Sequence, residues 1–180
     1  MKERNIVFNK GDIMEIRIAG LVNDSIVDGD GLRFAIFTQG CPHNCEGCQN
    51  PQTHDFSGGE IYIIKEIIDR VLENPLLDGV TFTGGEPFCQ AKALAEMAKT
   101  FLENNLNIIT YTGYTYEYLL ENSTSDNHYA DLLGVTDILI DGKFEIEKKD
   151  YNLRFRGSTN QRIIDCKNSL KSNSLILYEY

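Results

Sequence analysis

Three cysteine thiols fall within eight residues of this chain, at Cys41, Cys45 and Cys48. Thiolates are soft ligands, so a cluster of three predicts a metal centre. The C-x3-C-x2-C spacing differs from the paired C-x2-C motifs of zinc ribbons and supplies one ligand fewer than a closed tetrahedral site needs. If the metal is a cubane iron–sulfur cluster, the three cysteines bind three irons, and the fourth iron stays open to an exogenous ligand.

A second candidate segment, Gly84-Gly85-Glu86-Pro87, directly follows the β-rich run 79–83. Two residues without side chains leave main-chain N–H and C=O groups accessible to a ligand. Proline keeps the residue before it extended, so Pro87 fixes the direction of the Glu86 carboxylate. On its own such a turn is typical of a strand exit. This Gly-Gly-Glu-Pro turn, however, comes one helix and one strand after the cysteine loop. Both segments then follow the ends of successive strands, which favours a shared site.

Strands and helices alternate along the chain and can position these loops. The apolar run 32–38 predicts a buried strand ahead of the cysteines, and Ser57 and Glu60 form a capping box for a helix over 60–73. Further strands are expected at 16–20, 79–83, 107–112 and 136–140, and further helices at 90–104, 116–122 and 129–133. This order is typical of βαβ units, so the predicted fold is α/β with a parallel sheet. Ligand-binding loops leave such a sheet at the carboxyl ends of its strands.

Length and composition indicate one folded unit. The chain has 180 residues, 42% of them hydrophobic, and no apolar run approaches the roughly 18 residues that span a bilayer. We expect residues 1–14 to be an extension and residues 15–180 to form one domain. The start of the chain is too poor in apolar residues for a signal peptide, and five cysteines, an odd number, fit a reducing compartment better than a disulfide framework. We therefore expect a cytoplasmic protein with no membrane partner.

The charge of the chain is unevenly distributed. A net charge of −10 argues against nucleic-acid binding, which needs a basic surface. The last thirty residues are nevertheless basic, with two acidic side chains against five basic ones, Arg154, Arg156, Arg162, Lys167 and Lys171. This segment predicts either a solvated surface or a site for an anionic ligand or an acidic partner.

The cysteine motif followed by Gly-Gly-Glu-Pro resembles the radical S-adenosylmethionine enzymes. In that superfamily the three cysteines, here Cys41, Cys45 and Cys48, bind a [4Fe–4S] cluster. The methionyl amino and carboxylate groups of S-adenosylmethionine then bind its open iron. The glycine-rich turn holds the amino group, and residues beside the last cysteine lie near the adenine. The resemblance thus implies cofactor contacts at six positions: Gly47, Cys48, Gln49, Gly84, Gly85 and Glu86.

Within the superfamily, residues 15–166 are most similar to the activating proteins of anaerobic ribonucleoside-triphosphate reductase, which are glycyl-radical-activating enzymes. The segments that carry this similarity are 28–33, 40–51, 111–114, 137–144 and 155–165. The resemblance implies that Lys143, in the Asp-x-Lys that begins at Asp141, approaches the methionyl carboxylate. It also implies a cation site that involves Thr112 and Asp141. At this length we expect the sheet to form an incomplete TIM-like barrel, with its open side covered by the partner.

The reaction implied by the resemblance needs no acid or base from the protein. A one-electron donor such as a flavodoxin reduces the cluster, and S-adenosylmethionine is cleaved to methionine and a 5′-deoxyadenosyl radical. This radical removes a hydrogen from a glycine of the large reductase subunit. We expect no catalytic side chain, because the cofactors carry the difficult chemistry. Asp28, Gly29 and Gly31 form either an ordinary turn or a surface for the incoming glycine segment.

Three other interpretations remain open. An activase of another glycyl radical enzyme, of the pyruvate formate-lyase type, or a small-molecule radical enzyme of deazapurine synthesis would share both motifs. A structural zinc protein would take a fourth ligand from His43, His54 or Cys89. We favour a hydrogen-bonding or packing role for His43. Cys89 and Cys166 are expected to be plain thiols that pack as small apolar side chains.

Overall fold

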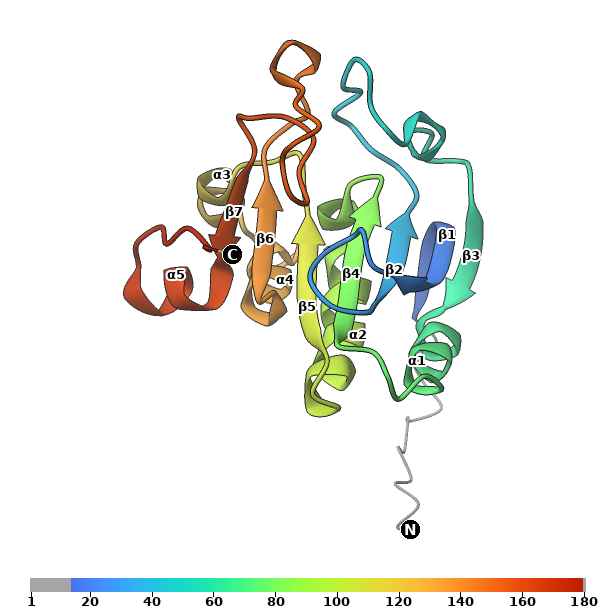
Figure 1. The fold of residues 1–180 in the computed structure, drawn as a ribbon. Helices are drawn as coiled ribbons and strands as arrows, with labels where there is room; N and C mark the ends of the chain where they lie inside the picture. Colours follow the sequence, from blue (N-terminus) through green and yellow to red (C-terminus); the bar gives the residue numbers. More distant parts are fainter. Residues whose placement is uncertain (1–13, 180) are drawn as a thin grey trace.

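The computed structural model describes residues 14–179, so the predicted extension lies outside the described residues except for Met14. Residues 14–179 form one sheet of seven strands with helices packed against it (Figure 1). In spatial order the strands are β3 (Glu60–Ile63), β1 (Glu15–Ser25), β2 (Arg33–Thr38), β4 (Gly79–Gly84), β5 (Asn107–Tyr111), β6 (Ile138–Asp141) and β7 (Arg162–Asp165). The helices are α1 (Ile64–Leu72), α2 (Ala91–Glu103), α3 (Tyr116–Glu121), α4 (Tyr129–Val135) and α5 (Cys166–Ser172).

The centre of the sheet is parallel and its edges are antiparallel. Strands β2, β4, β5 and β6 run parallel. Strand β1 is antiparallel to both β2 and β3, and β7 is antiparallel to β6. The expected α/β fold is confirmed, and the expected parallel sheet is found in its centre, whereas the pairing at both edges is antiparallel. Segments 26–32 and 142–161 contain no crossover α-helix that returns the chain to the other end of the sheet, so the strands that each connects are antiparallel.

Residues 60–63 form a strand rather than the first turn of a helix. They pair with Glu15–Ile18 of β1, and α1 begins only at Ile64. The predicted capping box at Ser57 and Glu60 is therefore wrong, and the Ser57 hydroxyl donates to the Asp55 carboxylate instead. The apolar residues of α1 do recur with a helical period. Residues 60–63, just before this helix, form a strand because they pair with β1.

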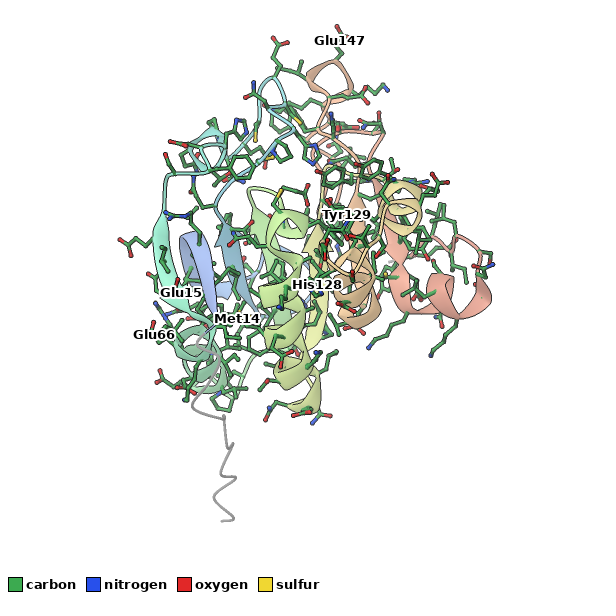
Figure 2. All side chains as sticks on the ribbon, turned by 180° about the vertical axis from the view of Figure 1, so that it is seen from behind. Met14, Glu15, Glu66, His128, Tyr129 and Glu147 are labelled. Atoms are coloured by element: carbon green, nitrogen blue, oxygen red, sulfur yellow. The ribbon has the colours of Figure 1, made fainter. Side chains whose placement is uncertain are left out.

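One face of the sheet is covered by α1, α2 and α4, which lie in front of it in the view of Figure 2. Their apolar sides pack against alternate strand side chains, such as Val80 and Phe82 of β4, in one large core. Helix α2 confirms the prediction over 90–104, because its buried residues recur on one side. No helix within residues 14–179 is both long and apolar enough to cross a membrane. The layer of α1, α2 and α4 holds the strands in place, and the loops at the carboxyl ends of the strands are left to form a site.

The opposite face of the sheet is crossed by the loop of residues 26–32, which passes in front of the central strands in Figure 1. Arg33, at the start of β2, is completely buried. Its guanidinium donates five hydrogen bonds of 2.6 to 3.1 Å, which end on the carbonyls of Asp30, Val80 and Asn107 and on the side-chain oxygens of Thr81 and Asn107. The Thr81 hydroxyl in turn donates to the carbonyl of Asp28 at 2.8 Å. These bonds hold the loop on the sheet.

The last two elements, β7 and α5, were not predicted. Strand β7 has only four residues, too few for a period-2 pattern to stand out. Asp165 caps α5 by accepting a hydrogen bond from the main-chain N–H of Asn168 at 3.0 Å. Cys166 follows this cap and is completely buried, and burial raises the pKa of its thiol to about 12. Its predicted packing role is confirmed.

Candidate functional site

A cavity of about 350 Å³ lies at the carboxyl ends of the central strands, within the size range of small-ligand sites. Six of the residues predicted to bind metal or cofactor line it, namely Cys41, Cys45, Cys48, Gln49, Gly84 and Gly85. The loop of residues 26–32 contributes Val27 and Asp28 to the same wall. Val27 is 74% exposed, so the cavity opens to solvent beside this loop. The turn at Asp28 is therefore part of the site rather than a remote connection.

The cysteine loop presents three thiols to the cavity in a partly buried setting. Burial raises the pKa of the Cys41 thiol and the pKa of the Cys45 thiol, although a main-chain N–H from Phe144 opposes the rise at Cys45. Such thiols stay protonated at neutral pH until a metal ion displaces the proton. Soft ligands of this kind suit iron–sulfur chemistry.

The arrangement of the thiols fits a cluster of several metal atoms. Within residues 14–179, no three Cys, His, Asp or Glu side chains converge as the ligands of one ion. Each cysteine of a cubane binds a different iron atom, so three sulfurs around one cavity need not meet at one point. The donor set and its placement therefore suit a [4Fe–4S] cluster held by Cys41, Cys45 and Cys48.

Gly84 and Gly85 allow the turn after β4 to lie directly against the cysteine loop. The N–H of Gly85 donates to the carbonyl of Thr38, and the N–H of Glu86 donates to the carbonyl of Gly40, both at 2.8 Å. A Cβ atom at Gly85 would lie 2.5 Å from the carbonyl oxygen of Gly40. Gly84 has a φ of +91°, which favours glycine. The two glycines thus line the cavity with main-chain atoms while they join the two predicted motifs.

Glu86 is completely buried and does not line the cavity. Its Oε1 accepts hydrogen bonds from the N–H of Phe88 (3.0 Å) and the hydroxyl of Thr112 (2.9 Å). Its Oε2 accepts from the N–H of Gly113 (2.9 Å) and lies 2.6 Å from Nε2 of His43. The carboxylate therefore ties together the cysteine loop, its own turn and the loop after β5. Its side-chain oxygens serve these protein contacts rather than facing the cavity.

His43 connects the cysteine loop to this buried carboxylate. Its side chain is 5% exposed, and its ring packs edge-on against Tyr114 with 4.5 Å between the ring centroids. The loop at Gly113 approaches so closely that a Cβ atom there would lie 2.3 Å from the His43 ring. The predicted hydrogen-bonding and packing role of His43 is confirmed. Because His43 lies between Cys41 and Cys45 in the sequence, its hydrogen bond to Glu86 also fixes the cysteine loop.

Asp141 and Lys143 do not line the cavity. Asp141 is buried, and its carboxylate accepts hydrogen bonds from the guanidinium of Arg162 and from the N–H of Tyr116. The hydroxyl of Thr112 is directed to Glu86, so the oxygens predicted for a cation site are engaged elsewhere. Lys143 is exposed at the surface. The side chains of Asp141 and Lys143 thus lie off the cavity wall, but Gly142 between them lines it, and the charge of Lys143 partly offsets the rise that burial causes in the pKa of the Cys45 thiol.

Gly47 is also absent from the cavity wall formed by the described residues, although its neighbour Gln49 contributes to it. Gly47 has a φ of +69°, and a Cβ atom there would lie 2.6 Å from Cδ1 of Ile146. The segment after β6 therefore covers the cysteine loop from outside. From this segment, Phe144 reaches the cavity and supplies an aromatic surface beside Gln49.

Arg156 lines the cavity and was not predicted as a site residue. One of its terminal nitrogens donates to the carbonyl of Gln161 at 2.7 Å, while its Nε atom is buried without a hydrogen-bond partner. A buried donor left unpaired costs about 1–3 kcal/mol, so such groups in native structures need an explanation. Two signals pointed to this region: its place in the segment 155–165 and its place in the basic part of the chain.

Comparison with known proteins agrees with this site. Residues 27–164 match the family described as "4Fe-4S single cluster domain". The anaerobic ribonucleoside-triphosphate reductase-activating protein of Pasteurella multocida is 34% identical over 149 residues, or 77% of this chain and 90% of that protein. The protein of the same name from Vibrio cholerae is 35% identical over the same shares. The pyruvate formate-lyase-activating enzyme of Clostridium pasteurianum is 32% identical over 130 residues, or 69% of this chain and 50% of that enzyme.

These matches confirm the predicted enzyme class and cofactors. The protein is a radical S-adenosylmethionine enzyme of the glycyl-radical-activating group, and its cofactors are a [4Fe–4S] cluster and S-adenosylmethionine. The match to the cluster family includes all three cysteines that line the cavity. By family model and by sequence identity over most of its length, the chain belongs to the family of anaerobic ribonucleoside-triphosphate reductase-activating proteins.

Proposed function

We propose that this enzyme generates the glycyl radical on the large subunit of an anaerobic ribonucleoside-triphosphate reductase. When bound, the cluster and S-adenosylmethionine supply a 5′-deoxyadenosyl radical after one-electron reduction. The names of the relatives from two organisms support this choice of partner. The observation that carries the proposal is that three cysteines and the main chain of Gly84 and Gly85 line the same open cavity.

The residues of this chain bind and orient rather than transfer protons. Cys41, Cys45 and Cys48 would hold the cluster, and the main-chain groups of Gly84 and Gly85 would hold the methionyl amino group. Gln49 and the ring of Phe144, on the same wall, would contact the adenosyl end. Glu86 would act indirectly, because the four hydrogen bonds of its buried carboxylate hold the surrounding loops together.

The open side of the sheet would receive the partner. Val27 and Asp28 line the cavity at its exposed edge and belong to the loop that Arg33 and Thr81 fix to the sheet. In this proposal the sheet is an incomplete barrel, and the glycine-bearing segment of the reductase closes it and excludes water. The electron would come from a small donor protein such as a flavodoxin, in the cytoplasm.

The test is to mix the reconstituted, reduced protein with S-adenosylmethionine and the reductase subunit, without oxygen, and to record electron paramagnetic resonance spectra. We expect a doublet from a glycyl radical. A Cys45→Ala variant, which lacks one cluster ligand, is the control and should give none. Cleavage of S-adenosylmethionine without a doublet would contradict the reductase as substrate and favour a small-molecule reaction.

A second candidate partner follows from the similarity to the pyruvate formate-lyase-activating enzyme of Clostridium pasteurianum. The same mixture with pyruvate formate-lyase in place of the reductase separates the two. A doublet with the lyase and none with the reductase would reverse the assignment. The match to that enzyme covers only half of its length, which favours the reductase.

A further inference from the structure

The sulfur of Cys48 accepts a hydrogen bond from the main chain of its own loop. The N–H of Asn50 donates to Sγ of Cys48 at 3.4 Å. Hydrogen bonds to the ligating sulfurs are among the factors that set the reduction potential of an iron–sulfur cluster, because they stabilise the extra negative charge of the reduced state. The residues that hold the Asn50 N–H in place therefore affect how readily the cluster accepts an electron.

Thr53 holds the main chain of Asn50 and is itself completely buried. Its hydroxyl donates to the carbonyl of Asn50 at 2.7 Å, and its N–H donates to the same carbonyl at 3.0 Å. Asn50 directly precedes the short 3₁₀-helical turn Pro51–Thr53, and its own side chain does not cap this turn. Two hydrogen bonds on one carbonyl restrict the backbone of Asn50, so its N–H stays directed at the Cys48 sulfur.

Thr53 also holds the other end of the cysteine loop. Its carbonyl accepts the N–H of Gly40 at 2.8 Å, and Gly40 directly precedes Cys41. One buried residue thus closes the loop, because its carbonyl binds the start of the loop and its hydroxyl binds the end. Thr53 is not among the described residues that line the cavity, so it acts on the cluster site through Gly40 and Asn50.

We propose that Thr53 is a positioning residue whose hydroxyl raises the reduction potential of the cluster by keeping the Asn50 N–H on the Cys48 sulfur. In the loaded protein Cys48 is a thiolate, and a hydrogen bond to an ionised acceptor is stronger than one to a neutral acceptor. The inference depends on the cluster and not on the identity of the partner, so it goes beyond the proposed function.

The test measures the midpoint potential of the reconstituted cluster by dye-mediated redox titration, without oxygen, S-adenosylmethionine or a partner protein. Thr53→Val keeps the shape of the side chain and removes its donor, whereas Thr53→Ser keeps the donor. We expect Thr53→Val to have a more negative potential. At a fixed solution potential, its ratio of reduced to oxidised cluster should be smaller by roughly two- to tenfold, the value of one hydrogen bond. Thr53→Ser should keep the wild-type potential.

Thr136→Val is the matched control for the substitution itself. Thr136 is also completely buried, and its hydroxyl donates to the carbonyl of Leu132 at 2.8 Å, directly after α4 and away from the cavity wall. We expect Thr136→Val to lower the thermal stability of the protein, because a buried hydrogen bond is lost, and to leave the potential unchanged. The control therefore separates a loss of stability from a shift in potential.

A second pair of variants repeats the comparison with a smaller side chain. Thr53→Ala and Thr53→Ser differ only in the hydroxyl, so the alanine variant should show the same negative shift relative to the serine variant. Loss of cluster binding in both Thr53→Val and Thr53→Ala would give Thr53 a purely structural role and would overturn the inference.

Three further results would overturn it. They are an unchanged or more positive potential in the variants without the hydroxyl, an equal negative shift in Thr53→Ser, and an equal negative shift in Thr136→Val. Failure of the wild type to generate a glycyl radical on the reductase would count against the proposed function alone, because no partner is present in these titrations.

Discussion

Two arginines at opposite ends of the sheet differ in how many of their N–H donors form hydrogen bonds within the chain. Arg33, at the amino end of β2, is completely buried and donates five hydrogen bonds to the protein. Arg156, at the cavity beyond the carboxyl ends, donates one, and its Nε is buried without an acceptor. The first completes the fold by fixing the loop of residues 26–32. The second keeps donors free at a wall shared with three thiols.

The number of unpaired guanidinium donors therefore distinguishes an arginine that stabilises the fold from one that can bind a ligand. A guanidinium whose N–H donors all meet oxygen atoms of the protein contributes to stability and has few donors left for a ligand. One that leaves a donor unpaired reduces stability slightly until a ligand supplies the acceptor. Both features can be read from hydrogen-bond partners, whereas the residue type alone does not distinguish them.

The largest expected effect is on the stability of the metal-free chain. Replacing Arg33 with Leu leaves the buried Val80 carbonyl and the buried Thr81 hydroxyl without these donors, so we expect the free energy of unfolding to fall by about 3 kcal/mol or more. Arg156→Leu removes one hydrogen bond together with an unpaired donor, and it should change stability by less than about 1 kcal/mol. Urea unfolding measures both. Equal losses in the two variants would remove the contrast between these arginines.

A smaller effect should follow from disturbing the contact between the two loops at the cavity. In Gly85→Ala, the new Cβ would lie 2.5 Å from the carbonyl oxygen of Gly40, and forced backbone shifts of this kind cost about 1–3 kcal/mol. Gly20→Ala in β1 is the matched control, since its Cβ would meet no atom within 4 Å. We expect the control to be neutral or to gain up to about 1 kcal/mol. Equal stability of the two variants in thermal unfolding would mean that the loops are not tightly joined.

The smallest effect concerns a third arginine, Arg162, which is paired with two carboxylates. Its hydrogen bonds to Glu117 hold the pKa of that carboxyl below its ordinary value of 4.5. A carboxyl whose pKa is lower in the folded state stabilises the fold above its unfolded pKa and loses this contribution as pH falls through its folded pKa. The stability difference between wild type and Glu117→Gln should therefore shrink below about pH 4.5. A difference that stays constant from pH 6 to pH 3 in urea unfolding would contradict this pairing.

The local parts of the fold were predictable because they depend on residues close together in the chain. Apolar periodicity located α2 and the central strands, and the motif spacing located the cysteine loop and the glycine turn on adjacent parallel strands. The edges of the sheet were not predictable in the same way. Residues 60–63 form a strand because they pair with β1, and the antiparallel direction of β7 follows from a connection that contains no α-helix.

The structure brings the central residues of the predicted site together and places its peripheral residues elsewhere. Cys41, Cys45 and Cys48 line the cavity with the two glycines, as their spacing after neighbouring strands suggested. Asp141, by contrast, is neutralised by Arg162, a residue of the next strand that only the antiparallel pairing of β6 and β7 brings beside it. No pattern in the sequence indicates such a pairing in advance.

The sequence by itself indicated the chemistry of this protein, because three soft ligands and their spacing on one loop predict a cluster with one iron left open. Tertiary structure decided which side chains face that chemistry. It turned the carboxylate of Glu86 inward to bind three loops and brought Arg156 to the cavity wall. The physical reason is that ligand spacing is a local property of the chain, whereas the burial and the hydrogen-bond partners of a side chain depend on segments distant in sequence.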